Sequence, residues 1–301
     1  MRGWTLGLLA ALAAAPAAAQ TDFSKIEIKT VDVAPGLFML QGAGGNIGLS
    51  VGADGAFVID DQFAPLAPKI AAAIAAKTSE PIAFVLNTHW HGDHTGGNEA
   101  MSGLGARIVA HDNVRARLKT GLVRAGGGET PPAPAGALPV VTFDRTITFH
   151  WNGQEIHAFH PDRAHTDGDA IVHFRTANVM HMGDVFFNGS YPYVDLESGG
   201  DLDGYIAAHE AALAVADDAT KIIPGHGPLA SKADLARTQA MLKDVRARIA
   251  ALIARGLDED AVVAADPLAD LNPVWGGGFI NGERMVRTAY RSLAAAASAP
   301  R

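Results

Sequence analysis

The stretch that decides the fold is His89-Trp90-His91-Gly92-Asp93-His94, which lies just past the apolar run 82–86. Three of the twelve histidines in the chain and one carboxylate fall within these six residues. Imidazole nitrogens and carboxylate oxygens are ligands that Zn²⁺ accepts readily, and they need no thiolate partner. The stretch therefore indicates a metal site in a loop at the end of a strand.

The spacing within this stretch suits two neighbouring metal positions. Side chains two residues apart leave an extended backbone on the same side, so His89 and His91 can hold one ion together. Asp93 and His94 are expected to turn toward an adjacent position. One segment can thus supply ligands to two sites, and the alternative is a surface cluster of histidines without any ligand.

The composition of the 301 residues is that of an ordinary globular protein, with 48% hydrophobic and 19% charged residues. A chain of this size can fill one large α/β domain or two small ones. The net charge of −8 argues against a nucleic-acid partner, because such partners are bound by an excess of Lys and Arg. We expect a small-molecule substrate, and the sequence gives no indication of the oligomeric state.

The N-terminus has the pattern of a secretory signal peptide. Arg2 provides the positive charge, residues 4–15 form a short apolar run, and three alanines at 17–19 provide a cleavage site. We therefore expect a signal peptide at 1–19, one domain at 20–301, a periplasmic location and no membrane association after cleavage. A retained membrane anchor is the alternative. The chain has no cysteine, so the exported domain would fold without disulfides.

Strands and helices alternate along the chain in two similar series. β-Branched runs bounded by Gly and Pro predict strands, and these fall at 26–33, 37–41, 47–51, 56–60, 82–86, 107–110, 146–150, 155–159, 170–175, 179–182 and 221–223. Apolar residues at helical spacing predict helices, and these fall at 66–77, at 112–120 with Asp112 as N-cap, at 202–216, at 231–255 with Ser231 as N-cap, and at 285–297.

The segment 121–139 is rich in Gly and Pro, and we expect it to be a surface loop without regular structure that joins the two halves; a flexible domain linker is the alternative. The first four strands suit an antiparallel meander. Together, the two series predict an α/β sandwich of two similar halves, packed sheet against sheet with helices outside. In such a sandwich, loops from both halves meet at one edge, so distant segments can share a site.

Three further metal-ligand candidates stand next to predicted strands. His165 precedes the strand at 170–175, Asp184 follows the strand at 179–182, and His226 lies in Pro224-Gly225-His226-Gly227 after the strand at 221–223. Glycine neighbours let the backbone approach a bound ion closely.

The set formed by the opening stretch, His165, Asp184 and the loop around His226 resembles the five ligand motifs of the metallo-β-lactamase superfamily, over essentially the whole mature chain. The resemblance implies a four-layer αββα sandwich with two Zn²⁺ ions at one edge. It also implies the ligand sets: His89, His91 and His165 for one ion, Asp93, His94 and His226 for the other, and Asp184 as a bridge between them.

Two positions discriminate within the family. Di-iron members usually carry Glu where this chain has His91, so the resemblance favours zinc. The β-lactamases of most similar spacing carry Cys at the position of Asp184 and Lys at the position of Phe187. An aspartate there looks more like glyoxalase II and lactonases, although the sequence reveals no basic C-terminal pocket for glutathione.

These features predict an exported dinuclear zinc hydrolase of a small cyclic amide or ester, of the β-lactam or lactone class. In such an enzyme, a hydroxide shared by the two ions attacks the carbonyl group, and Asp93 orients it and returns a proton to the leaving atom. The alternatives are a glyoxalase II-like thioester hydrolase, an iron-dependent redox or sulfur-metabolising member, and a non-enzymatic periplasmic metal-binding accessory protein.

Residues around the ligands are candidates for the substrate pocket. Aromatic side chains close to the ligand motifs can form its walls, and these are Trp90, Phe186, Phe187, Tyr191 and Tyr193. Asn188 is a candidate donor to an oxyanion. We expect substrate specificity to lie in the loops 43–46, 121–139 and 188–204.

Overall fold

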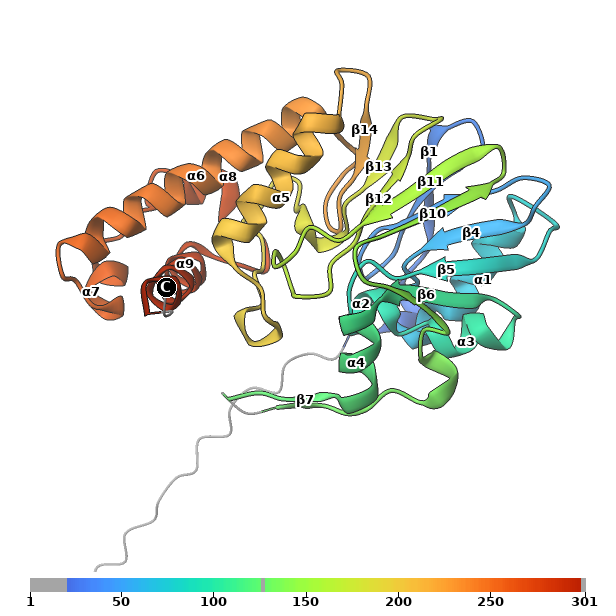
Figure 1. Ribbon diagram of the computed structural model, residues 1–301, viewed down its shortest axis with the longest axis horizontal. Helices are drawn as coiled ribbons and strands as arrows, with labels where there is room; N and C mark the ends of the chain where they lie inside the picture. The colour runs from blue at the N-terminus through green and yellow to red at the C-terminus, as the bar shows by residue number, and fades with distance from the viewer. Residues whose placement is uncertain (1–20, 126–127, 299–301) are drawn as a thin grey trace, which may run out of the picture.

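The computed structural model describes residues 21–125 and 128–298, and it shows two β-sheets packed face to face with helices on their outer sides (Figure 1). This is the αββα arrangement that the sequence predicts. The predicted signal peptide at 1–19 lies outside the described residues. Within the described part of the chain, no helix is long and apolar enough to cross a membrane.

The first sheet has seven strands in the order β1-β2-β3-β4-β5-β6-β9. Strands β1 to β4 form the expected antiparallel meander, and β4, β5, β6 and β9 run parallel. The strands are β1 (Lys29–Ala34), β2 (Leu37–Gln41), β3 (Ile47–Ser50), β4 (Ala56–Ile59), β5 (Ile82–Leu86), β6 (Arg107–His111) and β9 (Val141–Phe143).

The second sheet has six strands in the order β10-β11-β12-β13-β14-β15. Strands β10 to β13 are antiparallel to their neighbours, whereas β13 and β14 are parallel. The strands are β10 (Thr146–Trp151), β11 (Gln154–Phe159), β12 (Ile171–Phe174), β13 (Val179–His181), β14 (Lys221–Ile223) and β15 (Ala230–Ser231).

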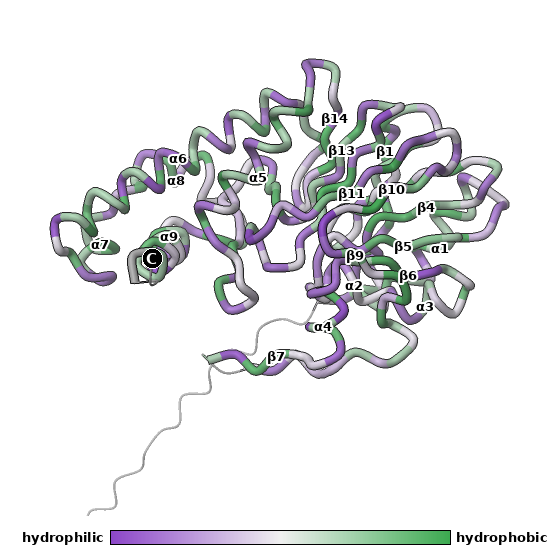
Figure 2. Tube along the Cα trace, in the orientation of Figure 1, coloured by the Kyte–Doolittle hydropathy of each residue, from purple (hydrophilic) through white to green (hydrophobic). Residues whose placement is uncertain are grey.

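The hydrophobic core between the sheets comes from alternate residues of facing strands. Phe57 and Leu86 of the first sheet and Ile156 and Val172 of the second belong to one buried cluster. Hydrophobic residues mark the inner strands of both sheets along the backbone tube (Figure 2). Burial of this apolar surface from both sheets fixes their packing, and thereby the edge at which their loops meet.

Helices cover both outer faces. The first half carries α1 (Ala67–Ala75), α3 (Asn98–Gly103) and α4 (Asp112–Thr120), and the single turn α2 (Gly92–Thr95) follows the end of β5. The second half carries α5 (Leu202–Val215), α6 (Lys232–Ala254), α7 (Glu259–Ala264), α8 (Asn272–Trp275) and α9 (Gly282–Ser298). Short 3₁₀ helices occur at Phe23–Lys25 (η1), Ala64–Leu66 (η2), Ala135–Ala137 (η3), Gly183–Val185 (η4) and Leu196–Ser198 (η5).

The predicted N-cap of α6 is confirmed and that of α4 is wrong. Ser231 and Asp234 form a reciprocal capping box at the start of α6. Asp112, in contrast, is already inside α4, and the cap is His111, whose ring nitrogen accepts a hydrogen bond from the backbone N–H of Asn113. The His111 side chain thus takes the place of the small polar residue that usually caps a helix.

The interpretation of 121–139 as an irregular loop between the halves is also wrong. Two short strands, β7 (Leu122–Val123) and β8 (Glu129–Thr130), pair in antiparallel fashion within it. Strand β9, which follows the segment, still belongs to the first sheet. The segment therefore belongs to the first half. It contains a short β-hairpin, although its composition predicts no regular structure.

Candidate metal centre

The candidate ligands gather at one edge of the sandwich because each stands at a strand end that points there. His89 follows β5, and α2 starts directly after His91. Asp184 lies in η4 after β13, and His226 lies in the turn after β14. His165 comes from the loop between β11 and β12. Four separate loops therefore contribute to one cluster.

The first group consists of His89, His91, His165 and Asp184, each of which has a ligand atom within 4.8 Å of the others. His165 Nε2 is 3.0 Å from His91 Nδ1. Asp184 Oδ2 is 3.7 Å from His165 Nε2 and 3.9 Å from His89 Nε2. Three nitrogens and one oxygen thus lie close enough together to hold one ion, and this is a donor set that zinc accepts.

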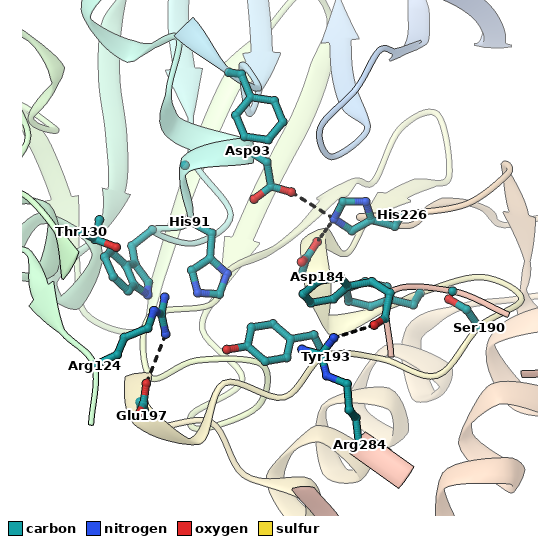
Figure 3. Close-up of a pocket in the computed structure, with 16 residues that line it drawn as sticks. His91, Asp93, Arg124, Thr130, Asp184, Ser190, Tyr193, Glu197, His226 and Arg284 are labelled. Atoms are coloured by element: carbon teal, nitrogen blue, oxygen red, sulfur yellow. Dashed lines mark hydrogen bonds and ion pairs between the residues drawn. The ribbon is translucent and has the colours of Figure 1, made fainter. Parts of the chain in front are cut away.

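The second group consists of Asp93, His94 and His226. Asp93 Oδ2 lies 3.6 Å from His94 Nε2 and 3.4 Å from His226 Nε2. Figure 3 shows the Asp93, Asp184 and His226 side chains pointing toward one another. The two sets of three residues that the resemblance implies each lie together in this way, and Asp184 joins the first.

Asp184 stands between the two groups and turns one carboxylate oxygen toward each. Its Oδ1 atom is 3.0 Å from His94 Nε2 and 3.3 Å from His226 Nε2, while Oδ2 faces the first group. A carboxylate placed in this way can bind two ions at once. This is the position of the predicted bridging ligand.

Asp60 orients the rings of His94 and His89, the first by a direct hydrogen bond and the second through the hydroxyl of Thr88. His94 Nδ1 donates to Asp60 Oδ2 at 2.7 Å. Thr88 donates its hydroxyl proton to the same oxygen of Asp60 and accepts from His89 Nδ1 at 3.0 Å. Since one nitrogen of each ring carries the proton outward, the other is free to face a metal ion.

The other two rings of the first group are oriented in the same manner. His91 Nε2 donates to Asp195 Oδ2 at 2.8 Å, and His165 Nδ1 donates to the Tyr193 carbonyl oxygen at 2.7 Å. Asp195 also accepts from the hydroxyl of Ser198 at 2.6 Å. Both partners of the rings come from the loop before α5, which therefore shapes the centre although it supplies no ligand atom.

The buried polar atoms test whether these residues fit a metal. Among the described residues, His89 Nε2, His94 Nε2 and Asp184 Oδ1 are buried and have no partner in hydrogen-bond geometry, although His94 Nε2 and Asp184 Oδ1 lie 3.0 Å apart. Leaving such atoms unpaired costs roughly 1–3 kcal/mol each, and all three face the interior of the cluster. The donor set of imidazoles and carboxylates fits zinc, so a metal ion is the natural partner for these atoms.

The electrostatics of the cluster favour bound positive charge. Burial lowers the pKa of His165 to about 4, so its ring is neutral and able to act as a ligand. Burial also opposes charge on His226, but the carboxylates of Asp184 and Asp93 raise its pKa to about 9. The two carboxylates therefore attract a cation to this position.

Two glycines allow the loops to close over the cluster. A Cβ atom at Gly225 would lie 2.1 Å from Asp184 Oδ1, and one at Gly45 would lie 2.1 Å from a ring carbon of His94. Any side chain at either position would displace a candidate ligand. Gly45 belongs to the predicted specificity loop 43–46, so this loop also packs on the metal centre.

A cavity of about 820 Å³ opens over the cluster (Figure 3). Of the predicted wall residues, Trp90, Phe187 and Tyr193 line it, whereas Phe186 and Tyr191 are buried in the core of the second half. Asn188 does not line the cavity, and its amide donates to the Pro228 carbonyl oxygen at 3.0 Å. The prediction of Asn188 as an oxyanion donor is therefore wrong.

Four residues at the site belong to none of the motifs in the sequence. Asp60 and Asp195 orient ligand histidines, and Arg124 and Arg284 bring positive charge to the cavity. Asp60 offered one usable signal in the sequence, because its carboxylate directly follows the buried apolar strand β4. The other three contact the site only through tertiary folding.

Comparison with known proteins matches residues 41–226 to the family model described as the metallo-beta-lactamase superfamily. A protein named hydroxyacylglutathione hydrolase from a Polaromonas species is 30% identical over 175 residues, which cover 54% of this chain and 59% of that protein. One of the same name from Anaeromyxobacter dehalogenans is 28% identical over 212 residues, covering 67% and 72%. The chain thus spans less than two thirds of the first relative.

Solved structures show the same fold. A metallo-beta-lactamase from Pontibacter korlensis superposes with a TM-score of 0.61 at 19% identity, covering 72% of this chain and all of that one. The sec-alkylsulfatase Pisa1 from a Pseudomonas species has a TM-score of 0.66 at 16% identity, covering 88% of this chain and 50% of that one. The second match extends further along this chain.

Proposed function

Because the chain belongs to the metallo-beta-lactamase superfamily, whose members are metal-dependent hydrolases, we propose that it is a dinuclear zinc hydrolase of small carbonyl compounds. The observation that carries this proposal is the placement of Asp184 between two convergent ligand groups. Zinc is favoured by His91, which provides a third imidazole to the first group.

The candidate ligands would bind two ions, and one of them would also transfer a proton. His89, His91 and His165 would hold one ion, Asp93, His94 and His226 the other, and Asp184 both. Zinc in such a site supplies Lewis acidity, which activates water and polarises a carbonyl group. Asp93 is the ligand carboxylate at the cavity surface, with 26% of its side chain exposed. It is therefore placed to take a proton from the attacking water and to pass it to the leaving atom.

The relatives favour a thioester as the first substrate class to test. Two of the proteins to which the chain is similar carry the name hydroxyacylglutathione hydrolase. The cavity lining weakens the β-lactam class, since Phe187, which lines it, stands at the position where the β-lactamases of most similar spacing carry Lys. Lactones and β-lactams, the classes that the sequence predicts, are the second candidates.

The proposal includes export. Residues 1–19 have the charge and apolar run of a signal peptide, and the described domain contains no cysteine. A periplasmic hydrolase would meet its substrate outside the cytoplasm. Fusion of residues 1–25 to a reporter that is active only after export tests this part.

The experiment is a substrate panel assayed with zinc-loaded protein. Thioesters, lactones and β-lactams are ranked by kcat/KM, and the same panel is run with His91→Ala and with His150→Ala. Loss of a ligand should lower kcat/KM by more than about 100-fold. His150 is exposed on the edge strand β10, away from the cavity, so its replacement should leave activity unchanged.

Turnover of thioesters ahead of the other classes supports the proposal as stated. Preference for lactones or β-lactams would overturn the thioester assignment and leave the hydrolase in place. Full activity of His91→Ala, or turnover by metal-free protein, contradicts the metal-dependent mechanism.

A further inference from the structure

The C-terminal segment forms a second wall of the cavity, facing the metal centre. Gly278, Phe279 and Arg284 line it together with Ser190 and Tyr193. Backbone contacts join this segment to the loop before α5. The Tyr191 N–H donates to the Trp275 carbonyl oxygen at 2.8 Å, and Tyr191 forms an antiparallel β-bridge with Ile280. This wall is therefore built into the fold.

Arg284, on the first turn of α9, is held in one position by Phe279. Its guanidinium carbon lies 4.3 Å from the centre of the Phe279 ring, and its Nη1 donates to the Phe279 carbonyl oxygen at 2.8 Å. The backbone N–H of Arg284 donates to Asn281 Oδ1 at 2.9 Å. The guanidinium is thus oriented, and its remaining N–H groups are available to a ligand.

Arg284 differs from the neighbouring arginines in its lack of a carboxylate partner. Arg287 and Arg291 of the same helix both bind Glu259, and Arg124 on the far wall binds Glu197 at 3.3 Å. No ion pair involves Arg284 among the residues described. It is therefore the cation at the cavity whose charge is not already neutralised.

An exposed aromatic side chain lies beside Arg284. Phe279 is 69% exposed although it is a large hydrophobic residue, and its ring meets that of Tyr193 edge to face at 5.9 Å. Trp90 and Phe187 line the same cavity. An exposed phenylalanine beside an unpaired arginine offers an apolar contact and a cationic contact to the same ligand.

We propose that Phe279 and Arg284 form a recognition subsite for a substrate with one anionic group, such as a carboxylate, on an apolar body. The inference rests on the proposed function, because it names the substrate class of that hydrolase. It also distinguishes among thioesters: a peptide thioester with two carboxylates would leave one of them without a free cation, since Arg124 is already paired.

The subsite is tested by binding, which does not require turnover. Calorimetric titration of metal-free protein with 4-phenylbutyrate and with 4-phenylbutanol compares an apolar carboxylate with its neutral counterpart. The carboxylate should bind more tightly to the unmodified chain. Arg284→Gln should weaken carboxylate binding about tenfold or more and leave the alcohol unchanged, because a charge-assisted hydrogen bond contributes roughly 1.5–3 kcal/mol.

Two further variants separate recognition from general charge or stability effects. Arg291→Gln removes the same charge from the same helix but does not line the cavity, and it should change neither affinity. Arg284→Lys keeps the charge and should retain part of the preference for the carboxylate.

The subsite is overturned if Arg284→Gln binds 4-phenylbutyrate as tightly as the unmodified chain does, or if that chain does not distinguish carboxylate from alcohol. The restriction to one anionic group is overturned if S-lactoylglutathione is turned over with a higher kcat/KM than monocarboxylate thioesters. If nothing in the substrate panel is cleaved but the binding preference holds, the proposed hydrolase fails while the subsite stands.

Discussion

Asp195 shows how a residue outside every ligand motif can control the metal centre. Its carboxylate accepts from His91 Nε2 at 2.8 Å and from the Ser198 hydroxyl at 2.6 Å. Trp90 donates its ring N–H to the same Ser198 hydroxyl at 3.2 Å. The side chain of Asp195 is therefore fixed, and it in turn fixes which nitrogen of His91 faces the other ligands.

Replacing Asp195 should weaken zinc binding without removing a ligand. We expect Asp195→Ala to lower zinc affinity about 10- to 100-fold, because the His91 ring loses the partner that orients it. Asp195→Asn keeps an acceptor oxygen and should lose less. Competition with a chromophoric chelator measures the affinity. Asp203→Ala, which removes a half-exposed aspartate paired with Arg246, is the control and should bind zinc normally.

Equal zinc affinity in Asp195→Ala and the unmodified chain would show that the hydrogen bond to His91 does not matter for the metal. Rescue by asparagine, in contrast, would separate orientation of the ring from the charge of the carboxylate.

The sequence predicts the seven candidate ligands but not the residues that orient the ligand histidines by hydrogen bonds. The ligands stand in short motifs whose residue types carry their own chemistry, such as the three histidines within 89–94. Asp195 is 104 residues away from His91 and has no such neighbours. Only the packing of the loop before α5 against the end of β5 brings the two together.

Among the elements, α6 depends on its first turn. Ser231 Oγ accepts from the backbone N–H of Asp234 at 3.3 Å, and Asp234 Oδ2 accepts from the Ser231 backbone N–H at 2.9 Å. This 23-residue helix packs against α5 and α9, so its start fixes the outer layer of the second half.

Loss of the capping box should destabilise the whole fold modestly. We expect Ser231→Ala to lower the free energy of unfolding by about 1 kcal/mol, because two backbone N–H groups lose their partners or their geometry. Urea denaturation followed by circular dichroism measures the change. Ser102→Ala in α3, where the side chain makes no hydrogen bond among those found in the described residues, is the matched control. A Ser231→Ala midpoint equal to that of the control would contradict the role of the cap.

Element prediction succeeds where a pattern is long and fails where it is short. Helix α6 carries apolar residues at helical spacing over several turns and a serine cap, so its bounds are predicted within one residue. Strands β7 and β8 have two residues each, which is too short for any alternation to be visible. Helices α7 and α8 are similarly short and were not predicted.

For the whole molecule, the sandwich explains how distant residues share one centre. Residues 89 to 94 come from the first half, whereas His165, Asp184 and His226 come from the second. Packing of the two sheets brings both sets of strand ends to one edge (Figure 1). The alternation of elements predicts this architecture, and the resemblance to the superfamily predicts where its metal ligands lie.

The halves are less alike than the sequence indicates. The first sheet has seven strands and the second six, and the chain after α6 adds the loop before α9, with Phe279, and the first turn of α9, with Arg284, to the cavity. The sequence predicts a closing helix there but nothing of its contact with the cavity. That contact arises from the packing of α9 against α6 and α7, which no local pattern shows.

If seven residues from loops of both halves hold two metal ions in one site, the metal content of the protein will show it. Elemental analysis of zinc-equilibrated protein, after removal of free metal, should find about two zinc ions per chain. Asp184→Ala should hold markedly less zinc because both groups lose their shared carboxylate, and Asp203→Ala should still hold both ions. A chain without bound zinc, one that holds iron in preference, or an Asp184→Ala variant with the full zinc content would contradict a dinuclear zinc site bridged by Asp184.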